Sequence, residues 1–134
     1  MTRTHITCLL AILLLAACEG KHAGVEQLHK ETMDIHDDAM ILITQMKRLG
    51  RALKQELSKQ DSIAPERRES IMTVLSQMDA ADTDMMNWMR DFKTPHGLKP
   101  EEALEYLNEQ KSLIKKNHED IQAAIAAAKQ LANQ

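Results

Sequence analysis

The chain has 134 residues and a formal net charge of −3, and charged residues of both signs make up 28% of it. This balance excludes the strongly basic surface typical of nucleic-acid-binding proteins. The chain holds one Trp, one Tyr and one Phe, which argues against a binding platform of stacked rings. Strong helix formers dominate, and no segment alternates β-branched and polar residues, so the sequence predicts an all-α fold.

The first 17 residues are typical of a cleaved signal peptide. Arg3 supplies the positive start, and the apolar segment 6–17 is shorter than the roughly 20 residues that a membrane-spanning helix needs. The sequence Leu-Ala-Ala-Cys at 15–18 resembles the lipobox recognised by lipoprotein signal peptidase. The resemblance implies cleavage before Cys18, a diacylglycerol thioether on its sulfur and acylation of the new amino terminus.

A lipid on Cys18 would anchor the chain to a membrane without spanning it, because every later apolar run is short. We expect a place in the cell envelope. The residue after the cysteine is Glu19 and not aspartate. By resemblance to the sorting rule of some enveloped bacteria, this favours the outer membrane and its periplasmic face. The alternative is an ordinary secretory signal that ends beside a cysteine. Cleavage would also remove Cys8, so no thiol or disulfide chemistry is expected in the mature chain.

Residues 18–24 are expected to form a lipidated tether, followed by one helical domain over 25–134. Apolar residues recur there in alternating steps of three and four, which predicts amphipathic helices with one face in a core. The predicted helices cover about 25–58, 65–92 and 100–131.

Two prolines and two short polar connections punctuate this pattern. Pro65 and Pro100 suit the first turns of helices, and acidic residues that favour the helix dipole follow each of them. The breaks at 59–62 and 93–99 are short, so neighbouring helices should pack antiparallel. The sequence therefore predicts an up-down-up three-helix bundle, with an extended coiled-coil homo-oligomer as the main alternative.

Some details of packing are also predicted. The three aromatic residues should gather at the end of the bundle that holds the second connection and the start of the first helix. Gly50 marks either a kink or a close approach between helices. Counting outward from the second connection places Asp82 level with Lys111, which predicts an ion pair between them and places His118 about 10 Å away.

The most suggestive chemical pattern lies on the first helix, where His29, Met33, His36 and Met40 share one side at the border of the apolar stripe. Imidazole and thioether ligands together suit copper, particularly Cu(I). Methionines at such positions more often fill gaps in a core, and the histidines would then lie at its border. Copper binding is therefore the alternative function, and no cofactor is expected under the main interpretation.

Catalysis has little support in the sequence. It lacks a His-Glu-x-x-His pair, a glycine-rich phosphate loop and a nucleophile elbow, so we expect no enzyme activity. The alanine-rich run 123–128 could admit another helix closely, although helix propensity explains it more simply.

Three stretches resemble small helical bacterial lipoproteins that are often labelled "viral A-type inclusion protein". They are Met33–Met40, Asp84–Lys93 and Glu105–Lys116. The resemblance implies the lipid anchor and the helices, and it brings no activity or functional residues. We therefore expect a lipid-anchored structural or protein-interaction module whose partners are the membrane and an envelope protein, with a homo-oligomer as a further option.

Overall fold

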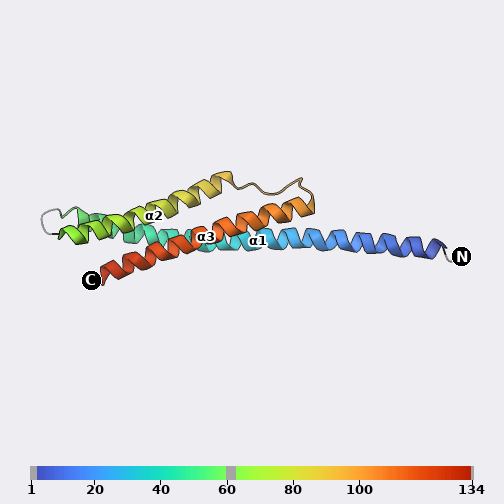
Figure 1. The fold of residues 1–134 in the computed structure, drawn as a ribbon, viewed down its shortest axis with the longest axis horizontal. Helices are drawn as coiled ribbons and strands as arrows, with labels where there is room; N and C mark the ends of the chain where they lie inside the picture. Colours follow the sequence, from blue (N-terminus) through green and yellow to red (C-terminus); the bar gives the residue numbers. More distant parts are fainter. Residues whose placement is uncertain (1–2, 60–62, 134) are drawn as a thin grey trace.

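The computed structural model describes the backbone of residues 3–59 and 63–133, and the side chains from Gly20 onward within those ranges. This part of the chain forms three helices and no strand: α1 (Arg3–Leu57), α2 (Pro65–Asp91) and α3 (Pro100–Ala132). The helices pack lengthwise into a narrow rod (Figure 1). The predicted all-α three-helix bundle is confirmed.

Helix α1 is much longer than its partners and extends past the start of α3 (Figure 1). Because it begins at Arg3, it includes the residues expected to form the signal peptide and the tether. Among the side chains that the structure describes, the first of α1 to contact α3 is Lys21, which forms an ion pair with Glu101. Three residues further on, a Cβ atom added at Gly24 would lie 3.8 Å from Leu104. Contacts of the bundle are therefore present by Lys21, three residues after Cys18.

Local sequence accounts for the ends of α2 and α3. Pro65 and Pro100 each occupy the first turn of their helix, where a missing N–H costs nothing. The Glu102 carboxylate accepts a hydrogen bond of 3.4 Å from the Lys99 amide as one half of a capping box. Helix α2 ends one residue earlier and α3 one residue later than predicted. The predicted polar break at 59–62 lies outside the described residues, except for Lys59.

Helices α1 and α3 run parallel and form the most extensive pair of the bundle. Ion pairs join Lys21 to Glu101 and Glu31 to Lys111, both across a separation of 80 residues. Helix α2 runs in the opposite direction to both (Figure 1).

The predicted ion pair between Asp82 and Lys111 is wrong. Asp82 lies 2.9 Å from Lys47 of α1, whereas the Lys111 ammonium donates to Glu31 over 2.7 Å. The prediction treated the second connection as a symmetric turn. In the structure α3 starts well beyond the end of α2 (Figure 1), so the residues of α2 face later residues of α3 than the count assumed.

The core is built from aliphatic and methionine side chains, with Met46, Met85, Ile114 and Ile121 almost completely buried. Gly50 is buried within the continuous helix α1, and a Cβ atom added there would lie 3.4 Å from Met78 Sδ. Of the two interpretations of Gly50, the structure therefore supports a close approach of α1 and α2.

A single arginine joins all three helices at the end of the bundle opposite the aromatic residues. The Arg67 guanidinium donates to both carboxylate oxygens of Glu56, at 2.9 and 3.2 Å, and to the Leu131 carbonyl at 2.6 Å. Bidentate pairs of this kind are the strongest and most directional ion pairs in proteins. The hydrogen bond from Arg67 also holds the pKa of the Glu56 carboxyl below its ordinary value.

Candidate functional site

Five rings form a stacked cluster where α2 ends and α3 begins. Trp88 and Phe92 stack with centroids 4.8 Å apart, and Phe92 stacks on Tyr106 of α3 at 6.1 Å. The Tyr106 hydroxyl also accepts a hydrogen bond of 2.8 Å from the Lys93 amide, which fixes the turn after α2 against α3. The expected gathering of the three aromatic residues at one end is confirmed.

Two histidines of α1 complete this cluster. His29 stacks on Phe92 at 6.0 Å with the ring planes 13° apart, and His36 stacks on Trp88 at 5.6 Å. The Nδ1 atom of His36 lies 2.9 Å from the exposed Asp37 carboxylate. With Nδ1 donating to this carboxylate, a neutral ring keeps its lone pair on Nε2. Both histidines thus have a packing role at the border of the core.

The two methionines of the candidate copper site also pack inward. Met33 and Met40 are partly buried against the hydrophobic core, where flexible thioether side chains commonly fill gaps. Eleven residues separate His29 from Met40, which is roughly 16 Å along a helix, so one metal ion cannot contact all four side chains. Only a pair one turn apart, such as His36 and Met40, could bind the same ion.

Other metal ligands do not gather in the described part of the chain. Its His, Cys, Asp and Glu side chains form no group of three or more that could hold a metal ion. Within these described residues, His36, Asp82 and His118 belong to no such group. The predicted offset of His118 from Asp82 along the bundle is wrong, because Asn117 donates to the Ala81 carbonyl and the neighbouring residues His118 and Asp82 therefore lie at similar heights.

Cys18, the predicted lipidation site, lies on α1 with its side chain outside the described residues. Within the described residues, no helix combines the length and the apolar character needed to cross a membrane. Neither finding tests the lipid anchor.

Sequence reasoning missed Asn117, a polar residue in the core of α3. It is 5% exposed, and its Nδ2 atom donates to the Ala81 carbonyl of α2 over 2.9 Å. Its Oδ1 atom is buried without a hydrogen-bond partner in the described structure, as is Nε1 of Trp88. The available signal was position, because Asn117 falls in the apolar stripe of α3, between Ile114 and Ile121.

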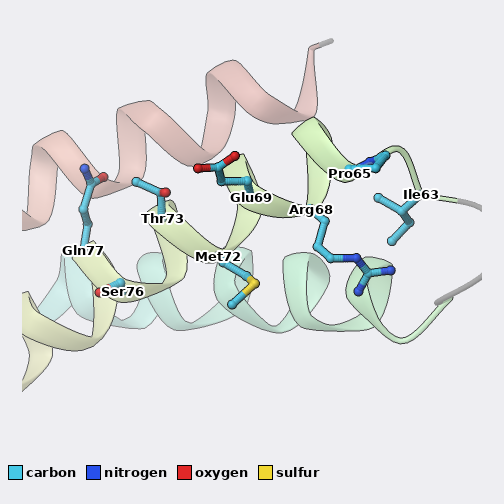
Figure 2. A pocket seen from close by; sticks show the side chains of 8 residues that line it. All are labelled: Ile63, Pro65, Arg68, Glu69, Met72, Thr73, Ser76 and Gln77. Carbon is cyan, nitrogen blue, oxygen red and sulfur yellow. The ribbon is translucent and has the colours of Figure 1, made fainter.

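The surface depressions of the bundle are shallow. Figure 2 shows one whose walls come only from α2 and the segment just before it, with the exposed Met72 among them. It is lined by Ile63, Pro65, Arg68, Glu69, Met72, Thr73, Ser76 and Gln77. A single glutamate is its only carboxylate and it holds no histidine, so this depression does not bring together an acid–base pair.

No protein-family model, no curated protein and no solved structure matches this chain. The resemblance to lipoproteins labelled "viral A-type inclusion protein" therefore stays a prediction.

Proposed function

We propose that this chain is a lipid-anchored lipoprotein of the cell envelope whose helical bundle is a non-catalytic structural or protein-interaction module. The observation that carries the proposal is the lipobox-like sequence at 15–18, directly after an apolar segment of signal-peptide length. Thioether-linked diacylglycerol and an acylated amino terminus together provide more than one acyl chain, and stable membrane anchoring requires at least two such chains or signals.

The position of the first helix contacts supports this proposal. Lys21 pairs with Glu101 and Gly24 lies against Leu104, so the bundle begins within one turn of Cys18. A lipid on that cysteine would hold the aromatic end of the rod close to the membrane surface. Confinement to a surface raises the effective concentration of the module for partners on the same membrane.

Mass spectrometry of the protein from its native host tests the anchor. We expect a chain that begins at Cys18 and carries diacylglycerol and an amide-linked acyl group. Cys18→Ala should abolish labelling by palmitate analogues and release the protein from membranes, whereas Cys8→Ala is the matched control and should change neither. A full-length chain from Met1 without a lipid adduct would refute the proposal.

Copper binding is the second candidate, and the one-turn spacing of His36 and Met40 at the partly exposed border of α1 is the observation in its favour. Titration of the purified protein with Cu(I) tests it. Sub-micromolar binding that is lost in His36→Ala with Met40→Ala would establish a copper-binding lipoprotein. Binding that survives the double substitution, or none at all, removes this candidate.

A further inference from the structure

A groove follows the seam between α2 and α3 and is lined by these two helices alone. It consists of three adjoining depressions, of which two share Asp84 and Asp120 and two share Ala127. On α3 its lining residues run from Gln110 to Leu131, which corresponds to about 31 Å of helix. The groove is therefore long enough to receive several turns of another helix.

Small side chains make this groove accessible to a helix backbone. Ala81 and Ala124 are almost completely buried, whereas Ala80 and Ala123 are exposed at its edges. The distance between packed helices depends on the side chains at the contact, so alanines permit a close approach.

The charges along the groove are strongly unbalanced. Lys116 is the only basic residue that lines it, and it forms an ion pair of 2.5 Å with Asp120. The acidic lining residues are Glu66, Glu69, Asp84, Asp91 and Asp120. The surface therefore favours a basic occupant.

The same chain carries a helix face of the opposite charge. Segment 39–55 of α1 contains four basic residues, Lys47, Arg48, Arg51 and Lys54, and no acidic residue. Arg48, Arg51 and Ala52 are exposed, and Ile41, at 70% exposure, is the most exposed of the large apolar side chains in the described part of the chain. The face from Ile41 to Gln55 is about 21 Å long and thus shorter than the groove.

We propose that this face of α1 docks into the α2–α3 groove of a second copy of the chain. Because the two surfaces differ, the contact is heterologous, and copies associate head to tail instead of forming a closed two-fold dimer. The inference deepens the proposed interaction role by naming the partner as the protein itself. Tethering of all copies to one membrane would favour the association, but the contact itself does not depend on the lipid.

Sedimentation velocity of the full chain in detergent tests this contact. We expect reversible association at low salt that weakens at high salt, because exposed charges attract one another across the interface. Arg48→Glu with Arg51→Glu should weaken the association by at least roughly tenfold. Lys115→Glu with Lys129→Glu changes the net charge equally at exposed residues outside the groove and should leave it unchanged. Far-UV circular dichroism verifies that each variant is folded.

A mixing experiment identifies the two surfaces. Asp84→Lys with Asp120→Lys should also prevent self-association, while a mixture of this variant with the Arg48, Arg51 variant should form pairs. Pairing in the mixture arises because each chain supplies the surface that complements the other. A wild-type chain that stays monomeric at low salt, or a mixture that does not pair, overturns the inference. A chain without lipid should behave in the same way, so failure here is distinguishable from failure of the anchor.

Discussion

Asn117 allows the packing argument to be tested by a single substitution. This side chain is buried between α2 and α3 with one hydrogen bond, from Nδ2 to the Ala81 carbonyl, and one unpartnered acceptor, Oδ1. Replacing it with leucine removes both features and extends the apolar stripe that Ile114 and Ile121 define. The balance of these effects decides whether Asn117→Leu raises or lowers the free energy of unfolding.

The expected balance favours the leucine variant. Loss of the hydrogen bond to Ala81 costs about 1 kcal/mol, and removal of a buried unpaired acceptor returns about 1–3 kcal/mol. Burial of the leucine side chain contributes about 1.5–3 kcal/mol, from which an overpacking cost of about 1–3 kcal/mol must be subtracted. Asn117→Leu is therefore expected to stabilise the bundle by about 1–2 kcal/mol.

Urea unfolding followed by far-UV circular dichroism measures this change. Asn108 provides a matched control, since its Nδ2 atom also donates to a main-chain carbonyl, that of Leu104, but at an exposed position of the same helix. Asn108→Leu should change the free energy of unfolding by less than about 0.5 kcal/mol. If Asn117→Leu instead destabilises the chain, Oδ1 is satisfied in solution and the view of Asn117 as a partly unpaired group is wrong.

The remaining predictions concern charge and close packing. The hydrogen bond from Arg67 lowers the pKa of Glu56 in the folded chain. The stabilisation from this ion pair is therefore complete above the ordinary glutamate pKa of 4.5 and is lost as the pH falls through the lower pKa of the folded state. Arg67→Met should flatten the acid side of a plot of Tm against pH. Gly50→Ala should stabilise α1 by up to about 1 kcal/mol, since alanine has the higher helix propensity and its Cβ would make only an ordinary contact, 3.4 Å from Met78 Sδ. Gly50→Leu should instead lower Tm, and equal effects of the two substitutions would contradict a close approach of α1 and α2. Asn117→Asp should destabilise increasingly as the pH rises above about 3.9, since burial raises the pKa of the new carboxyl; a pH-independent effect would argue against its burial.

The helices themselves could be predicted from the sequence because their signals are local. Pro65 and Pro100 mark helix starts, and the spacing of Ile114 and Ile121 identifies an inward face. The stacking of Trp88 on Phe92 also follows from spacing, since residues four apart lie on one face of a helix. These inferences required no knowledge of how one helix sits against another.

The relative heights of the helices could not be predicted, because no local signal sets them. Counting from an assumed symmetric turn placed Lys111 of α3 beside Asp82 of α2. In the structure the α3 residue at this level of α2 is Asn117, which donates a hydrogen bond to the Ala81 carbonyl. The connection after α2 is extended at Phe92 and again at Lys99, and its length shifts α3 along the bundle (Figure 1). The partners of polar residues on α3 depend on that shift, so the hydrogen bond from Asn117 to Ala81 could not be predicted, although the place of Asn117 in the apolar stripe was visible in the sequence.

The parallel pair of α1 and α3 shows how such a register becomes defined without a connecting turn. Lys21 with Glu101 and Glu31 with Lys111 repeat one offset along both helices, and the hydrogen bonds of these pairs lower the pKa of Glu101 and of Glu31. Each of these surface pairs is weak, the partly buried Glu31–Lys111 pair included, but a shift of one helical turn would break both pairs together. The core would lose its matched apolar layers in the same step, so polar pairs at the border and packing inside favour a single alignment.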